Sequence, residues 1–306
     1  MDRFTELQVF AAIAETTNLT RASEMLGMSV SGVSRALSSL ESRLGARLIQ
    51  RTTRQLSLTL EGERFARDAR EILHDLRAAE ESASRGSAEP RGVLRIGASL
   101  SFALLHLMPV IRQFKADYPL IRIDLQASNR YYDIIENGLD LAIRTRRSEV
   151  DSSVTIRKLA EVPRQLAASP DYLARHGVPA SPEDLLRHHL LLYTLADDWD
   201  ELQLSRHDQV RRLAVSGDFV SNDGQLLVQA ALDGLGILLQ PAYILQDALS
   251  AGRLQQVLPD WRAPGLTMSI AYPSRRFLPL RTRLFIDALV QHFRENEFEQ
   301  RWQAHT

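Results

Sequence analysis

Short polar and basic side chains gather between residues 20 and 54 in a pattern that suits contact with nucleic-acid phosphates. Five serines fall between Ser29 and Ser39, although serine is a mediocre helix former because its hydroxyl competes for backbone groups. From Arg35 to Arg54 the chain holds five arginines and one acid, a local net charge of +4 against −1 for the whole chain. Such a patch is the electrostatic footprint of a DNA-binding surface. A solvated helix face that tolerates short polar residues is the alternative interpretation.

Two helices with a tight turn between them would position these side chains. Thr20 can cap a first helix, Gly27 can end it with a positive φ, and Ser29 can cap a second helix. The first helix has apolar residues on one face at Ala22, Met25 and Leu26. Gaps of three and four residues predict a buried stripe on the second helix, formed by Val30, Val33, Leu37, Leu40 and Leu44. This is the pattern of a helix-turn-helix that places its second helix in the DNA major groove.

A hairpin wing is predicted directly after the second helix. Gly45 ends that helix, and residues 48–51 and 55–58 have the pattern of two short strands around a basic turn. The predicted DNA contacts come from the helix-turn-helix and the wing, and they are Thr20, Arg21, Ser29, Ser31, Ser34, Arg35, Ser38, Arg51, Thr52, Thr53 and Arg54.

A long helix is predicted from Leu60 to Arg85, with Thr59 as its cap. Its apolar residues follow a strict seven-residue repeat and are surrounded by charged residues. We predict that this seam joins two copies of the chain through Phe65, Ala69, Ile72, Leu76, Ala79 and Ala83. Such a coil would hold two DNA-binding helices at the fixed spacing that paired half-sites require. A helix packed against its own domain is the alternative.

The composition is that of an ordinary globular chain of two or three domains, with 44% hydrophobic and 25% charged residues among 306. The chain has no cysteine, which excludes disulfides, cysteine metal sites and thiol redox sensing. No signal-peptide core or membrane-spanning apolar run is present, so we expect a cytoplasmic protein without membrane contact. There is no glycine-rich phosphate loop or Gly-x-Ser-x-Gly elbow, and the adjacent His188 and His189 are not spaced as metal ligands. We therefore predict no catalytic site, no metal site and no cofactor.

A hinge is predicted at residues 86–92, GSAEPRG, because glycine and proline interrupt regular structure. Beyond it, strands alternate with helices, which is typical of parallel sheets with helices on their faces. The predicted strands are 93–98, 121–127, 139–145, 165–169, 188–193, 210–217, 218–222, 236–240 and 266–272. The predicted helices are 101–118, 130–137, 170–176, 223–233 and 280–296. The last strand and helix are predicted to return to the first of two similar lobes.

Ligands of such sheets bind beyond the carboxyl ends of strands, at helix N-termini. Residues at these strand ends, with one tryptophan at the rim, are the predicted small-molecule contacts, namely Ser99, Leu100, Ser101, Ser128, Asn129, Arg144, Trp199, Ser221 and Asn222. Arg144 is a candidate carboxylate clamp, because a guanidinium pairs bidentately with a carboxylate. An ion pair of Arg144 with Asp133 or Asp140 is the alternative.

The segment from residue 4 to residue 62, with LQVFAAIAE, VSRALSSLE and LGARLIQRTTR, resembles the winged helix-turn-helix of the LysR-type transcriptional regulators. The remainder, with RIGAS, DIIENGLDLAIR and LAASPDYLARHG, is similar to the two-lobed sensor of that family. The resemblance implies an α/β protein with an N-terminal winged helix-turn-helix, a long linker helix and a periplasmic-binding-protein-like effector domain of two α/β lobes. The implied domains are 1–59, 60–86 and 87–306, with lobes at about 92–161 plus 267–306 and at 162–266.

The resemblance also implies what the protein does. It implies a sequence-specific DNA-binding regulator, controlled by a small-molecule effector between the lobes and assembled as a dimer of dimers on double-stranded operator DNA, with RNA polymerase as a further candidate partner. Asn129 replaces a usual aspartate and Thr145-Arg146-Arg147 replaces a usual glycine-containing turn, and the extra arginines favour an organic acid. The alternative class is an enzyme or solute-binding protein whose helix-turn-helix is a structural bundle. The basic patch and the heptad seam have no role in that class.

Overall fold

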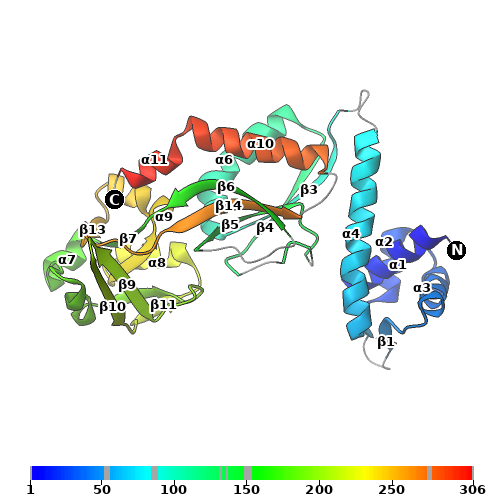
Figure 1. Ribbon diagram of the computed structural model, residues 1–306, viewed down its shortest axis with the longest axis horizontal. Coiled ribbons are helices and arrows are strands. Elements are labelled where there is room, and N and C mark those ends of the chain that lie inside the picture. Colours follow the sequence, from blue (N-terminus) through cyan, green and yellow to red (C-terminus); the bar gives the residue numbers. More distant parts are fainter. Residues whose placement is uncertain are drawn as a thin grey trace. The chain divides into compact units, whose positions relative to one another are not determined.

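The computed structural model describes residues 2–51, 56–83, 89–130, 133–135, 137–147, 154–273 and 278–304. At Arg51, and at residues 71, 74, 75 and 77–83, the description covers the backbone alone. The chain divides into two units, one formed mainly by residues 1–88 and the other mainly by residues 89–306 (Figure 1). None of the helices in these described ranges has the length and apolar character that a membrane crossing requires.

The first unit is a winged helix-turn-helix that continues into a long helix. Its elements in chain order are α1 (Arg3–Thr16), α2 (Leu19–Leu26), α3 (Val30–Leu44), β1 (Ile49–Arg51), β2 (Leu56–Leu58) and α4 (Leu60–Ala83). Strands β1 and β2 pair antiparallel and form the wing. Gly27 and Gly45 follow α2 and α3 with φ angles of 62° and 65°. Both predicted helix ends are therefore confirmed, because glycine adopts this left-handed conformation without a steric penalty.

Polar caps define where the helices of this unit begin. Ser29 and Thr59 each accept a hydrogen bond from the backbone amide three residues further on, at 3.1 and 2.9 Å, so both predicted caps are confirmed. The predicted cap at Thr20 is wrong. Asn18 takes that role, because its Oδ1 accepts hydrogen bonds from the amides of Thr20 and Arg21 at 2.9 and 3.1 Å.

The apolar core of the first unit lies mainly between α1 and α3, with Val9, Phe10, Ile13, Val33, Leu37 and Leu40 fully buried or nearly so. Three residues of the predicted apolar faces, Met25, Val30 and Leu44, are exposed instead. Val30 and Leu44 are the first and last residues of α3, so they lie beyond the part of the helix that the core covers.

The first half of the predicted seam on α4 belongs to the core of its own unit. Ala69 is fully buried there, and Phe65 packs against the same cluster, with its ring centroid 5.4 Å from that of Phe10. Ala69 is therefore covered by its own domain, whereas Phe65 is only partly buried and its role in joining two copies stays a prediction. At Ala69 the structure agrees with the alternative, a helix packed against its own domain.

The next part of the seam faces solvent. Ile72 and Leu76 are 50% and 36% exposed, whereas Leu73 between them is only 5% exposed. Helix α4 thus carries one apolar face that is covered within the unit and a second that is not. The side chains of Ala79 and Ala83 lie outside the described residues.

The second unit contains two five-stranded sheets, each the centre of one lobe. Across the first sheet the order is β4 (Ile121–Ala127), β3 (Gly92–Ala98), β5 (Leu141–Arg146), β14 (Leu266–Pro273) and β6 (Val154–Val162). Across the second sheet the order is β11 (Phe219–Ser221), β8 (Leu190–Tyr193), β12 (Ile237–Pro241), β7 (Arg164–Ala168) and β13 (Gln255–Val257). The return of the last strand to the first lobe is confirmed, since β14 pairs with both β5 and β6.

Neither sheet is wholly parallel, which corrects the prediction. Strand β3 runs parallel to β4 and β5, and β8 runs parallel to β11 and β12. Strand β14 runs antiparallel to β5 and β6, and β7 runs antiparallel to β12 and β13. The antiparallel pairs involve the segments that pass between the lobes, because such a segment enters its new sheet from the opposite direction.

Helices flank both sheets (Figure 1). The helix predicted at 101–118 is a continuous run of α5 (Leu100–Phe102), a π-helical turn (Ala103–Leu107) and α6 (Met108–Asp117). The others are α7 (Pro170–His176), a 3₁₀ turn (Pro182–Arg187), α8 (Gly224–Leu232), α9 (Ala242–Ser250), α10 (Leu280–Glu295) and α11 (Phe298–Gln303). A separate antiparallel hairpin consists of β9 (Glu201–Arg206) and β10 (Gln209–Ala214).

The helix predicted for residues 130–137 is wrong over the described part of that segment. Ile134 and Ile135 begin turns in which their carbonyls accept the amides of Leu139 and Gly138 at 2.9 and 3.1 Å. Gly138 has a φ of 61°, which ends any helical path at this point.

Candidate functional site

The helix-turn-helix presents most of its predicted DNA contacts to solvent. Six of them are exposed, namely Thr20, Arg21, Ser29, Ser31, Arg35 and Ser38. Ser34 is half-buried. Arg51 is described by its backbone alone, and Thr52, Thr53 and Arg54 lie outside the described residues.

Several serines of this region make hydrogen bonds within the DNA-binding unit itself. Ser29 caps α3, and the Ser38 hydroxyl donates to the Ser34 carbonyl at 3.0 Å. The Ser39 hydroxyl donates to the Glu6 carboxylate at 2.7 Å. The number of serines alone is therefore weaker evidence for DNA contact than the sequence suggests.

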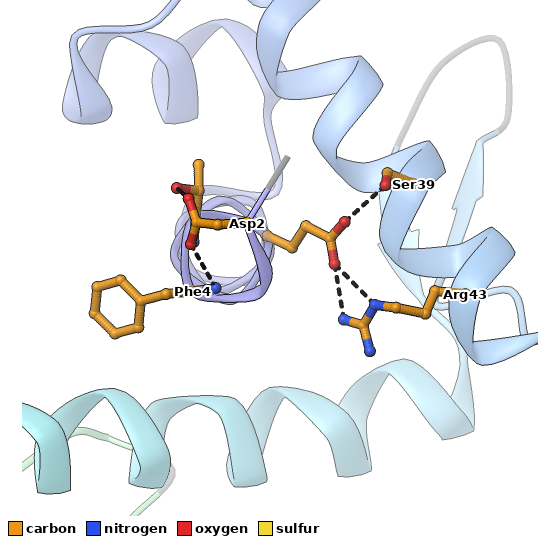
Figure 2. A network of polar contacts seen from close by, with 6 residues as sticks. Asp2, Phe4, Ser39 and Arg43 are labelled. Atoms are coloured by element: carbon orange, nitrogen blue, oxygen red, sulfur yellow. Dashed lines mark hydrogen bonds and ion pairs between the residues drawn. The ribbon is translucent and has the colours of Figure 1, made fainter.

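A buried carboxylate fixes α3 against α1 (Figure 2). Glu6, which is 2% exposed, accepts hydrogen bonds from Nε and Nη2 of Arg43 at 3.0 and 2.7 Å. Figure 2 shows Ser39 and Arg43 reaching from α3 toward the same carboxylate of α1. The hydrogen bonds from Ser39 and then from Arg43 hold the pKa of Glu6 below its ordinary value of 4.5. The charge of Arg43 is thereby offset within the fold.

Glu41, the one acid of the basic stretch, holds the start of the wing. Its Oε1 accepts hydrogen bonds from the amides of Leu48 and Ile49 at 2.8 and 3.1 Å. Arg35 and Arg47 remain exposed. Among the described residues, the positive charge available to DNA is thus smaller than the number of arginines in the sequence suggests. It is concentrated on these two arginines and Arg21.

A cavity of about 760 Å³ lies between the two lobes of the second unit, within the size range of small-molecule sites. Six of the nine predicted contact residues line it, namely Ser99, Ser101, Ser128, Asn129, Arg144 and Trp199. Leu100, Ser221 and Asn222 are not part of the lining. The Ser221 hydroxyl instead accepts the Asp223 amide at 3.1 Å.

The helix start at this cavity already has hydrogen-bond partners of its own. The Leu100 amide donates to Oδ1 of Asn129 at 3.1 Å, and the Phe102 amide donates to the Ser99 hydroxyl at 3.2 Å. Ser101 is buried beside them. A ligand anion at this helix terminus would therefore replace the Asn129 side chain or bind next to it.

Asn129 also connects the two lobes. Its Nδ2 donates to the Asn222 carbonyl at 3.1 Å and to Oδ2 of Asp223 at 2.6 Å. The other oxygen of Asp223 caps α8 by accepting the amides of Gln225 and Leu226 at 2.9 and 3.1 Å. A single amide side chain thus links the helix start of one lobe to the helix cap of the other.

Arg144 lines the cavity from within β5, which continues to Arg146, and is 8% exposed. Asp140, one of its two alternative ion-pair partners, accepts the Arg95 amide at 2.8 Å and contacts Nη2 of Arg281 at 3.5 Å. The assignment of Arg144 as a carboxylate clamp stays a prediction.

Four further arginines line the cavity and are absent from the predicted set, namely Arg130, Arg146, Arg147 and Arg164. Nη1 of Arg147, beyond β5, lies 2.8 Å from Oδ2 of Asp198 in the other lobe. Nε of Arg164, the first residue of β7, donates to the Pro264 carbonyl at 2.8 Å. Burial, with a further contribution from the charge of Arg147, lowers the pKa of Arg164 to about 10. The Thr145-Arg146-Arg147 sequence was the available signal for two of them, whereas nothing local marks Arg164.

Two tyrosines and a glutamine also line the cavity without having been predicted, namely Tyr193, Gln240 and Tyr243. Burial raises the pKa of Tyr243 to about 12, although hydrogen bonds with the side chains of Ser99 and Thr145 oppose the shift. Burial also raises the pKa of Tyr193. Both phenols are therefore neutral at physiological pH and can donate hydrogen bonds to an anion.

A winged helix-turn-helix in the same chain as a two-lobed α/β receptor defines a ligand-responsive DNA-binding regulator. Residues 4–63 match the family model described as bacterial regulatory helix-turn-helix protein, lysR family, and residues 87–294 match the LysR substrate binding domain. The chain belongs to the LysR family of transcriptional regulators. Members of this family bind operator DNA, respond to small-molecule effectors and oligomerise, and they are regulators rather than enzymes.

Individual relatives agree with this assignment. The chain is 34% identical to the HTH-type transcriptional regulator CrgA of Neisseria meningitidis serogroup B over 295 residues, which cover 95% of this chain and 97% of CrgA. It is 31% identical to the HTH-type transcriptional activator AaeR of Escherichia coli over 96% of this chain and 95% of AaeR. The full-length structure of the Vibrio cholerae virulence activator AphB superposes with a TM-score of 0.63 at 31% identity, covering 95% of this chain and 99% of AphB.

Proposed function

We propose that the effector of this regulator is a small organic acid bound in the cavity between the lobes. The observation that carries this proposal is the concentration of arginines, Arg144, Arg146, Arg147 and Arg164, around one cavity of small-molecule size. A guanidinium binds a carboxylate with charge-assisted hydrogen bonds, often two at once. Ser99, Ser101 and the neutral tyrosines supply further donors nearby.

The effector acts by shifting the population between arrangements of the two lobes. Asn129 with Asp223 and Arg147 with Asp198 each join one lobe to the other, so a ligand that engages these residues changes how strongly the lobes are held together. A ligand can shift such an equilibrium only by its difference in affinity for the two arrangements. We assign the sensing role to residues 87–306, with lobes at about 92–161 plus 267–306 and at 162–266.

Residues 1–59 act as the DNA-binding domain in this proposal. Ser34 and Arg35 read base edges, while Ser29, Arg51 and Arg54 hold phosphates, because base contacts specify and phosphate contacts position. Thr20, Arg21, Ser31, Ser38, Thr52 and Thr53 complete the contact surface. The exposure of Arg35 and Ser31 on α3 supports this assignment.

Residues 60–86 join two copies through the exposed apolar face of α4, which includes Ile72 and Leu76. Pairing of dimers into a tetramer would place several DNA-binding helices along one operator, as spaced half-sites require. The cytoplasm, where operator DNA and RNA polymerase are present, is the proposed place of action, and RNA polymerase is the proposed further partner.

Mobility-shift titrations with the full-length protein and the DNA upstream of its gene test the proposal. A panel of small carboxylates is compared with the corresponding neutral amides. At least one carboxylate should change the DNA affinity and raise the melting temperature, since a ligand that binds only the folded state adds about 2.7 kcal/mol of stability at one hundred times its Kd. The amides should do neither.

Calorimetry with the responding carboxylate then locates the site. Ser101→Ala and Arg144→Ala should both weaken its binding. If both variants bind it as tightly as the unmodified protein, the pocket lies elsewhere. If no carboxylate changes either DNA affinity or melting temperature, the organic-acid proposal fails.

A further inference from the structure

We propose that the effector carries two anionic groups on an apolar or aromatic spacer, and that Arg147 and Arg164 hold the second group. This inference rests on the proposed function, because it specifies the class of acid that occupies the same cavity. A monoanionic acid would use only one end of the cavity.

The charges that line the cavity favour a dianion. Five arginines line it, namely Arg130, Arg144, Arg146, Arg147 and Arg164, against three acids, Asp197, Asp198 and Glu201. The lining among the described residues therefore carries two more cations than anions. Asp197 and Glu201 are exposed, and Asp198 is the half-buried acid of the three, so the acids lie mostly at the rim.

The carboxylate of Asp198 contacts Arg147 directly and acts on Arg164 through its charge. The side chain of Arg147 is 2.8 Å from that of Asp198, and the charge of Asp198 also acts on Arg164. The charge of Arg147 opposes the cationic form of Arg164, whose pKa burial has already lowered. Two guanidinium groups that line one cavity, with the charge of a single carboxylate acting on both, leave a surplus positive charge that a ligand anion would offset, because opposite charges stabilise each other.

The Arg164 side chain is held in place for this role. Its Nε donates to the Pro264 carbonyl, which leaves the two terminal nitrogens of the guanidinium for the cavity that it lines. An arginine fixed through Nε loses less rotamer freedom when it binds an anion. Arg147 approaches from the other lobe, so one ligand group would contact both lobes at once.

Apolar side chains also line the cavity. They include Leu192, Leu195, Trp199, Leu239 and Ile244. An apolar or aromatic spacer between two anionic groups would bury its surface against these side chains and gain about 25 cal/mol per Å² removed from water. A short hydrophilic dianion, such as inorganic phosphate, would not use them.

Matched pairs of acids provide the test on the full-length protein. Glutarate, adipate and pimelate are compared with valerate, hexanoate and heptanoate, and isophthalate is compared with benzoate, by titration calorimetry at constant ionic strength. At least one diacid should bind about tenfold or more tightly than its monoacid. A tenfold ratio of affinities corresponds to about 1.4 kcal/mol, which one hydrogen bond to a charged group can contribute.

Two substitutions assign the selectivity to the proposed residues. Arg164→Gln and Arg147→Gln should each reduce the diacid-to-monoacid ratio toward one, because the diacid loses a partner of its second anionic group. Arg211→Gln is the matched control, since Arg211 lies on the β10 hairpin beside Glu183 and outside the cavity lining. It should preserve the ratio. Far-UV circular dichroism and the melting temperature check that each variant is folded.

The possible failures are distinguishable. If monoacids bind as tightly as every diacid in the series and alter DNA affinity, the dianion inference is wrong and the organic-acid proposal stands. If diacids are selected but the ratio survives both Arg164→Gln and Arg147→Gln, the second anionic group lies elsewhere and the assignment is wrong. If neither class binds, both the inference and the proposed function fail.

Discussion

The side chains of Asn129 and Asp223 join the two lobes through a hydrogen bond of 2.6 Å from Nδ2 to Oδ2. The same amide accepts the Leu100 backbone hydrogen through Oδ1 at 3.1 Å. An amide can donate and accept at once, whereas an ionised carboxylate can only accept. The asparagine at this position is therefore matched to the acid that it faces.

Asn129→Asp should weaken the contact between the lobes. The new carboxylate would face that of Asp223, and the free energy of unfolding of the sensor should fall by about 1–3 kcal/mol at pH 7. Below about pH 4 a protonated carboxyl can donate again, so the loss should shrink there. Chemical denaturation of the full-length protein at both pH values measures this loss in the free energy of unfolding.

Asn222→Asp is the control, because the Asn129 amide contacts only the backbone carbonyl of Asn222. An equal loss of stability in that variant would contradict the role assigned to Asn129.

Glu6→Gln should destabilise the DNA-binding unit by about 1 kcal/mol near neutral pH, because the ion pair with the partly exposed Arg43 and the hydrogen bond from Ser39 are weakened. The folded-state pKa of Glu6 is lowered from 4.5. Its contribution is therefore present above the unfolded-state pKa and is lost as the pH falls through the lowered folded-state value. Denaturation curves from pH 7 to pH 3 should show a smaller difference between the variant and the unmodified protein at the acid end. The exposed Glu24 offers the control Glu24→Gln; a pH-independent difference would contradict the role of the Glu6 charge.

Arg35→Ala should reduce affinity for the specific operator by about 1–3 kcal/mol and flatten the preference among DNA sequences. The physical reason is the loss of an arginine that is exposed on α3, the helix expected to enter the major groove. Fluorescence anisotropy with operator and scrambled DNA, at a fixed salt concentration, measures both affinities. Equal losses on both DNAs would mean that Arg35 contacts phosphates only.

Ile72→Asp combined with Leu76→Asp should separate the dimer without unfolding the unit, because both side chains are exposed on α4. Sedimentation velocity should show monomers, and binding to the full palindrome should be lost. Leu73→Ala is the contrasting variant, since Leu73 is 5% exposed and its truncation should cost about 2–5 kcal/mol of stability. A double variant that remains dimeric would exclude this face from self-association.

Structural features that depend only on residues close together in the sequence could be predicted from it. The glycines after α2 and α3, the caps at Ser29 and Thr59 and most strands of the sensor follow from local patterns, and the structure confirms them. The seven-residue repeat on α4 did not predict which surface its apolar face packs against. A three-and-four spacing shows that a helix face is apolar, but it does not show whether the face meets its own domain or another copy.

The cavity was harder to predict, because its residues come from both lobes. Ser99 and Ser128 follow strand ends and were found by that rule, whereas Arg144 lies within β5, which runs on to Arg146. Arg164 begins a strand on the far side of the crossing between lobes, and its proximity to Arg147 depends on how the two sheets are brought together. No spacing along the chain contains that information.

The position of β14 also determines the order in which the two units of this regulator can complete their folding during synthesis. Strand β14 lies between β5 and β6 in the first sheet, although the whole second sheet precedes it in the chain. The helix-turn-helix uses a continuous run of residues near the start of the chain and can fold while the ribosome is still translating the remainder. A message cut short before residue 266 would therefore yield a product with an intact DNA-binding head and an incomplete receptor.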